Sequence, residues 1–286
     1  MENFHQEISQ LFKSACVAEL AALKPGNVHI FADGHGMTMQ DFVKSAEVVT
    51  AIIAQPDLSL GQRIFLSVQA THKAVACNTN LGIILLCAPL IHAVITVKNG
   101  TLRQRLQQVL EQTSVTDAQF TFDAIALAKP AGLGVASQHD VHQVADCNIL
   151  QAMQSAAERD LIALQYTNSF EAIFNVSLPI LAQINADNIP LNQTWLTTRL
   201  YLNLLATFPD SHIVRKYGAT VAGQVQQQAK EHLANFNLSV NPKTYQRQLL
   251  DWDRQLKQQG INPGTSADLT VASLFAYELT KLTVSE

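Results

Sequence analysis

The apolar segment 81–97, LGIILLCAPLIHAVITV, constrains the fold more than any other part of the chain. Its side chains must be removed from water along nearly the whole segment. Its length approaches the lower limit for a membrane-spanning helix. It contains Pro89 and His92, however, and no second such segment, basic flank or aromatic belt accompanies it. We therefore expect a buried central helix and not a membrane span.

Helical periodicity dominates the remaining sequence. Apolar residues near the N-terminus recur at spacings of three and four, namely Phe4, Ile8, Leu11, Phe12, Ala15 and Leu20. Thr38 followed by Asp41 is typical of a helix start, and the periodicity continues from there to Pro56. Further helices are expected over 60–77, 101–112, 117–128, 148–166, 170–185, 194–207, 211–235, 242–259 and 266–286.

Alternating strand patterns are almost absent, and the best candidate, 94–97, continues an apolar helix. The composition, 48% hydrophobic and 15% charged, supplies a large core. No long linker and no repeat divides the sequence, so we predict an all-α fold with one compact domain over 1–286. The break at 138–144 is the only plausible subdivision.

Charge and cysteine content exclude some classes of protein. A net charge of -4 argues against binding nucleic acid through a broad basic surface. The four cysteines are scattered without a CxxC pair, which indicates free thiols in a reducing compartment. The first residues lack the basic start and apolar run of a signal peptide. We expect a cytoplasmic protein with neither membrane nor nucleic-acid partners.

The breaks between the expected helices hold the polar residues that are candidates for function. The first is KPGNVH at 24–29, where Pro25 ends a helix and Gly26 permits a close backbone approach. Lys24 could then meet an anionic group. A helix-terminating turn with a solvated lysine is the simpler interpretation of this motif alone.

The second break is NTNLG at 78–82, directly before the apolar helix. Asn78 and Thr79 are natural N-cap residues, and the free amides of a helix's first turn form an anion site. Ordinary capping explains these residues as well as a functional role does. Polar groups at the mouth of so apolar a helix need partners if they are buried.

The third break is PDSHIVRK at 209–216. With Ser211 as N-cap, the basic residues His212, Arg215 and Lys216 fall in the first turns, and His212 and Arg215 share a face. Positive charge at this end opposes the helix dipole, and a bound polyphosphate would remove that conflict. A solvated, charged helix start is the structural alternative.

The fourth break is NPGTSADL at 262–269. Here Thr265 or Ser266 is expected to cap a helix, with Asp268 in its first turn. Asp268 would interact favourably with the helix dipole and could also hold a magnesium ion. A structural capping box is the better interpretation of this motif alone.

Weaker signals lie between the second and third breaks. No strand precedes Gly132-Leu133-Gly134, which excludes a dinucleotide fingerprint there. The side chains of His139, Asp140 and His142 could bind a metal, but their spacing is poor for zinc.

Together and in this order, the four breaks resemble the triphosphoribosyl-dephospho-CoA synthase family over nearly the whole chain. Glu19 and the segment ERDLIALQY at 158–166 are also similar. The chain looks closest to a divergent branch found in methanogens and methylotrophs. The resemblance implies that the 2'-hydroxyl of 3'-dephospho-CoA is joined to C1' of the ATP ribose, with release of adenine. Such a reaction needs a stabilised oxocarbenium-like transition state, a base and a donor for adenine.

The resemblance also implies site residues, with ATP as substrate and Mg²⁺ as cofactor. Glu19, Asp210 and Asp268 are the carboxylates for magnesium or for base catalysis, and these roles are not divided among them. Arg159 and Asp160, expected inside a helix, line the same cavity or form a buried structural ion pair. The nucleotide is bound by Lys24, Gly26, Asn78, Thr79, Ser211, His212, Arg215, Lys216, Gly264 and Ser266.

Some positions depart from the pattern of the citrate lyase pathway. Asn80 and Leu81 replace a common His and Lys, His29 replaces Asp, and Thr265 replaces Gly. These changes suggest altered substrate recognition, so the same chemistry on an acceptor in tetrahydromethanopterin or other one-carbon cofactor biosynthesis stays open. A non-catalytic nucleotide-binding protein is the third hypothesis. The expected partners are small-molecule substrates, and a homodimer is left open.

Overall fold

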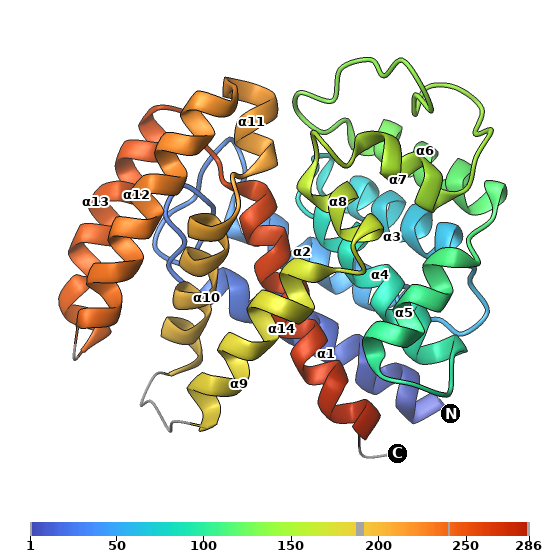
Figure 1. Cartoon of the computed structure of the whole chain (residues 1–286), viewed down its shortest axis with the longest axis horizontal. Coiled ribbons are helices and arrows are strands. Elements are labelled where there is room, and N and C mark those ends of the chain that lie inside the picture. Colours follow the sequence, from blue (N-terminus) through green and yellow to red (C-terminus); the bar gives the residue numbers. More distant parts are fainter. Residues whose placement is uncertain (1, 187–191, 240, 285–286) are drawn as a thin grey trace.

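The computed structural model describes residues 2–186, 192–239 and 241–284, and every regular element in these ranges is a helix (Figure 1). Two isolated β-bridges in the loop 29–37 are the exception to helical structure. The predicted all-α class is confirmed. The elements are α1 (Glu2–Ala21), α2 (Met39–Thr50), α3 (Leu60–Val75), α4 (Leu81–Thr96), α5 (Leu102–Glu111), α6 (Val115–Ala128), α7 (Ile149–Ala156), α8 (Leu161–Thr167), the π-helix η1 (Ala172–Ser177), α9 (Leu178–Ala186), α10 (Gln193–Thr207), α11 (Ser211–Tyr217), α12 (Ala219–Leu238), the 3₁₀ helix η2 (Pro242–Tyr245), α13 (Gln246–Gln258) and α14 (Gly264–Val284).

Local sequence determines where many of these helices begin. A capping box starts each of the helices α2, α3, α5, α6 and α7. In a capping box, the side chains of the N-cap and N3 residues each accept a hydrogen bond from the other's backbone N–H. Thr38 and Asp41 form the first of these, as predicted. Asp117 also accepts hydrogen bonds from Ser59 Oγ at 2.6 Å and Gly61 N at 2.9 Å. That carboxylate therefore joins the starts of α3 and α6.

Helix α4 is the buried centre of the fold, as its apolar sequence predicts. All residues from 81 to 91 are buried. Pro89 lies inside the helix and cannot donate to the Leu85 carbonyl one turn earlier. The buried Tyr166 hydroxyl donates to that carbonyl at 2.6 Å instead. In the described part of the chain, no helix is both long and apolar enough to cross a bilayer.

Non-helical breaks interrupt two of the predicted helices. The segment 148–166 breaks before α8, where Asp160 accepts hydrogen bonds from the amides of Ile162 and Ala163 and starts a new helix. Arg159 and Asp160 thus lie in a break and not inside a helix. The segment 211–235 breaks at Gly218, whose φ of +87° ends α11 before α12 begins.

The core consists of two hydrophobic clusters. The larger surrounds α4 and takes residues from α1 to α9, α10 and α14, whereas the smaller packs α10 to α13 against one another. Helices α10 and α14 contribute to both clusters and join them, and α14 runs between the two groups in Figure 1. The predicted single compact arrangement with a buried central helix is confirmed.

Candidate active site

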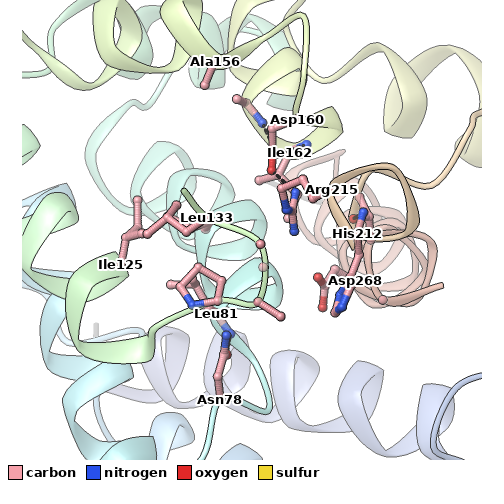
Figure 2. Close-up of a pocket in the computed structure, with 18 of the residues that line it drawn as sticks. Asn78, Leu81, Ile125, Leu133, Ala156, Asp160, Ile162, His212, Arg215 and Asp268 are labelled. Carbon is pink, nitrogen blue, oxygen red and sulfur yellow. Dashed lines mark hydrogen bonds and ion pairs between the residues drawn. The ribbon is translucent and has the colours of Figure 1, made fainter. Parts of the chain in front are cut away.

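All four sequence breaks meet at one cavity of about 280 Å³, lined by helices of both hydrophobic clusters (Figure 2). Each break contributes lining residues. Asn27 comes from the first, Asn78 and Thr79 from the second, His212 and Arg215 from the third, and Asn262, Gly264 and Asp268 from the fourth. The volume is close to the lower end of small-molecule sites, about 300 Å³. The sequence motifs are therefore parts of one site.

The first turn of α4 forms one wall of this cavity. Asn78 accepts a hydrogen bond from Leu81 N at 3.1 Å, but the N-cap of α4 is Asn80 and not Asn78 or Thr79, so the predicted cap is wrong by one or two residues. Thr79 instead donates to Ser45 Oγ at 2.6 Å, on α2. Asn80 also lines the cavity, and its buried Oδ1 has no hydrogen-bond partner among the described residues. Asn80 thus belongs to the site, although the sequence indicates only a departure from the family pattern at this position.

Asp268 approaches α4 closely because residue 82 is glycine. A Cβ at Gly82 would lie 2.6 Å from Asp268 Cγ and 2.7 Å from Ile162 Cδ1. The Asp268 carboxylate is partly buried, lines the cavity and has no hydrogen-bond partner among the described residues. Burial, followed by the negative charges of Glu19 and Asp210, raises its pKa well above the usual value. Asp268 is thus an available carboxylate that takes up a proton readily.

Asp210 is fully buried and holds the starts of two helices. Its Oδ1 accepts hydrogen bonds from His212 N at 2.9 Å and Ile213 N at 3.2 Å, and its Oδ2 accepts from the amide and hydroxyl of Ser266 at 2.7 and 2.8 Å. Asp210 is therefore the N-cap of α11, and the prediction that Ser211 caps this helix is wrong.

The start of α14 also differs from the sequence prediction. The helix begins at Gly264, so Thr265 and Ser266 lie inside it and Asp268 lies beyond its first turn. Thr265 Oγ1 is 3.0 Å from Ser211 Oγ and accepts from His212 N at 3.2 Å. Ser211 and Ser266 therefore join α11 to α14, and neither belongs to the cavity lining.

Lys24 is also fully buried and is saturated by partners inside the protein. Its ammonium group donates to Glu19 Oε1, to Asn27 Oδ1 at 2.9 Å and to the Val28 carbonyl at 2.7 Å. These acceptors use all three of its donors. Neither the solvated lysine nor the anion-binding lysine considered from the sequence matches these contacts. Lys24 instead positions Glu19, which lines the cavity.

Gly26 also has a supporting role. Its φ is +85°, and a Cβ there would lie 2.8 Å from Pro263 Cδ. Its amide donates to Asp253 Oδ1 at 2.8 Å. The residue permits the first and fourth breaks to pack together but does not line the cavity.

Basic groups lie on the α11 side of the cavity, with Asp160 facing them (Figure 2). Arg215 forms an ion pair with Asp160 that crosses from α11 to the start of α8. Arg159 also lines the cavity, whereas Lys216 is exposed and lies outside the lining. Burial and the neighbouring cations lower the pKa of His212 to about 4. His212 is thus a neutral hydrogen-bonding group at neutral pH.

The three carboxylates predicted to hold magnesium do not gather into one cluster. Among the described residues, the only group of three or more ligand atoms within 4.8 Å of one another is His139, Asp146 and Cys147. Asp210 has no free lone pair, because it accepts four hydrogen bonds. Glu19 and Asp268 both line the cavity and remain available to a cation.

The opposite wall of the cavity is apolar and was not recognised from the sequence. It comes from α6, α7 and the loop between them, with Phe122, Ile125, Leu133, Ile149 and Met153 among its members. Figure 2 shows Ile125 and Leu133 facing the polar side formed by Arg215, His212 and Asp268. Apolar periodicity alone does not separate Phe122, Ile125, Ile149 and Met153 from ordinary core residues, and Leu133 lies in a loop without periodicity.

Comparison with known proteins identifies the family of the chain. The chain resembles in fold a crystal structure of a protein provisionally identified as a triphosphoribosyl-dephospho-CoA synthase from Archaeoglobus fulgidus, with a TM-score of 0.63 and 20% identity over 84% of this chain and 97% of that chain. No curated protein sequence matches the chain significantly. The sequence profile of the ATP:dephospho-CoA triphosphoribosyl transferases matches residues 5–286. This chain therefore belongs to the ATP:dephospho-CoA triphosphoribosyl transferase family, whose members transfer the triphosphoribosyl group of ATP to dephospho-CoA.

Proposed function

We propose that the reacting ends of ATP and dephospho-CoA meet in this cavity and that a hydroxyl of dephospho-CoA displaces adenine from the ATP ribose. Cleavage of the glycosidic bond releases adenine and keeps the triphosphate on the transferred sugar. The observation that carries this proposal is the convergence of the four motifs on one cavity that contains an unpaired carboxylate, a neutral histidine and two arginines.

We assign the triphosphate to the side of Arg215 and Arg159. Arg215 is held in place by Asp160, and guanidinium groups bind phosphate oxygens through paired hydrogen bonds. The first amides of α4 face the same cavity and favour negative charge. Five residues predicted to bind the nucleotide do not contact it in this assignment, because they lie outside the cavity lining: Gly26, Lys24, Ser211, Lys216 and Ser266. Lys24 acts through Glu19, which it positions.

Asp268 is our candidate for the general base. Its raised pKa brings proton affinity closer to the working pH, where a base is most effective. It would take the proton of the attacking hydroxyl as the bond to C1' forms. His212, as a neutral imidazole, would donate a hydrogen bond to a ring nitrogen of the departing adenine.

Magnesium fits the remaining carboxylate. Glu19 lines the cavity, and only its Oε1 has a hydrogen-bond partner among the described residues, so the other oxygen is available. Magnesium is commonly held by one or two carboxylates together with substrate phosphates. When bound it would neutralise charge on the triphosphate. We place the enzyme in the cytoplasm, since it uses ATP and its four cysteines are free.

Adenine release tests the proposed function. Purified protein with ATP, Mg²⁺ and dephospho-CoA should produce free adenine and a triphosphoribosylated product, measured by chromatography and mass spectrometry. Controls lack either the acceptor or Mg²⁺. Release that requires a phosphorylated pterin in place of dephospho-CoA would reject dephospho-CoA as the acceptor. ATP binding without adenine release on any acceptor would reject the transferase assignment.

The variant Asp268→Asn separates the two carboxylate roles. We expect Mg²⁺-dependent ATP binding to persist while turnover falls by about 10²- to 10⁴-fold, the usual contribution of a general base. Loss of Mg²⁺-dependent ATP binding in this variant, with binding retained in Glu19→Gln, would reverse the assignment.

A further inference from the structure

The loop between α6 and α7 brings together three side chains of metal-binding type. One ligand atom from each of His139, Asp146 and Cys147 lies within 4.8 Å of the others. His139 Nδ1 is 2.8 Å from Asp146 Oδ1. The three side chains thus converge on one point of the loop.

We propose that His139, Asp146 and Cys147 bind a transition-metal ion of the Zn²⁺ class, at a site separate from the carboxylates that face ATP. The donor set of one nitrogen, one oxygen and one sulfur suits zinc and disfavours Mg²⁺, which selects oxygen ligands. Binding would release the thiol proton to solvent and leave a thiolate on the metal, while the neutral imidazole would keep its proton on the ring nitrogen that faces away from the ion. Three protein ligands leave at least one coordination position for water.

The surroundings of the three residues suit a site of this kind. Cys147 is buried, His139 is half-buried and Asp146 is exposed, so the cluster reaches from the interior to solvent and an ion can enter. His139 has a φ of +50°, a conformation that is uncommon outside glycine. It also lines the cavity, whereas Asp140 accepts hydrogen bonds from the amides of Ala136 and His142 and serves the loop itself.

A metal at this position would fasten both ends of the loop 139–147. The preceding segment of the loop, which includes Leu133, forms part of the apolar wall of the cavity. The bond from Ala145 N to Gln119 Oε1 at 2.8 Å already ties this loop to α6. The bound ion would therefore stabilise this wall. The inference does not depend on turnover, since metal binding is measured without substrate.

Metal binding is tested on the full-length protein after treatment with a chelator. Zn²⁺ titration by calorimetry should give one ion per chain. The measured heat of binding should differ between buffers, because the buffer takes up the proton released by the thiol. Co²⁺ should give the absorption band of a thiolate-bound cobalt. Cys147→Ser should remove that band and weaken Zn²⁺ binding by at least about tenfold, the lower range for damage to a metal site. His139→Ala should weaken binding similarly.

The matched control is Cys77→Ser, which removes a half-buried free cysteine outside the cluster. It should leave the cobalt band and the Zn²⁺ affinity unchanged. Zn²⁺ should also slow proteolysis within the loop in wild type but not in Cys147→Ser. A wild-type protein that binds no Zn²⁺, or binds it equally well after Cys147→Ser, would overturn the proposal. Such a result would leave the proposed transferase activity untouched, because adenine release is measured in a separate assay.

Discussion

Gly82→Ala is the sharpest perturbation of the proposed chemistry. The new methyl group would lie 2.0 Å from Asp268 Oδ2 and 2.6 Å from its Cγ. Non-bonded heavy atoms in normal contact are about 3.5–4.0 Å apart, so the carboxylate must move by more than about 1 Å. The carboxylate is the end of a flexible side chain and has no hydrogen bond to lose, so this movement costs little stability. Alanine is also a better helix former than glycine by about 1 kcal/mol.

We therefore expect a folded protein with a displaced base. A misplacement of about 1 Å can reduce turnover by about 10²-fold. The assay is the rate of adenine release under saturating substrates, with thermal unfolding measured on the same samples. Gly223→Ala is the matched control, because a Cβ at this helical glycine meets no atom within 4 Å. That control should keep full activity and gain about 0.4–1 kcal/mol of stability.

A double variant tests whether Gly82→Ala acts through Asp268. If Gly82→Ala acts through Asp268, combining it with Asp268→Asn should reduce turnover no further than Asp268→Asn alone. Wild-type turnover in a folded Gly82→Ala protein would refute the assignment of Asp268 as base. Additive losses in the double variant would show that the methyl group acts on some other part of the site.

Three further predictions concern stability. Tyr166→Phe leaves the Leu85 carbonyl without a donor and should lower the free energy of unfolding by about 1–3 kcal/mol in urea titrations; an unchanged value would contradict this role. Gly61→Ala places a Cβ 2.5 Å from the Asp117 backbone, which cannot move aside, so circular dichroism should detect destabilisation of at least about 1–3 kcal/mol. The pKa of His212 is lowered from 6.5 to about 4, so the unfolded chain binds a proton at higher pH than the folded one does. Stability should fall as the pH decreases through this window, and less so in His212→Asn.

The sequence predicted the fold where the signal is local. The apolar segment of α4 and the capping pair Thr38–Asp41 lie within a few residues of the structure that they determine. The break at Asp160 was missed because apolar periodicity continues across it on both sides. Only the hydrogen bonds from Ile162 N and Ala163 N identify Asp160 as the start of a new helix.

The site was predicted in part for the same reason. The motifs predicted residues near the cavity. Sequence spacing alone does not distinguish a residue that contacts the substrate from one that holds another residue in place. Lys24 has its acceptors close in sequence, yet its burial depends on packing with distant helices. Asp210 bonds Ser266 across 56 positions of the chain, which no local pattern reveals. The cluster around Cys147 requires a loop whose shape was not predicted.

The double cap made by Asp210 has a consequence for recombining this chain with its relatives. A single carboxylate orients the backbone of two segments, and its partners in both are amides or a hydroxyl at fixed positions. A chimera whose crossover falls between residues 217 and 262 would take these segments from different parents. It would keep the hydrogen bonds between Asp210 and Ser266 only if both parents carry the aspartate and the serine. Crossovers outside 209–268 transfer both segments from one parent, so the two motifs form one exchangeable module despite their separation in sequence.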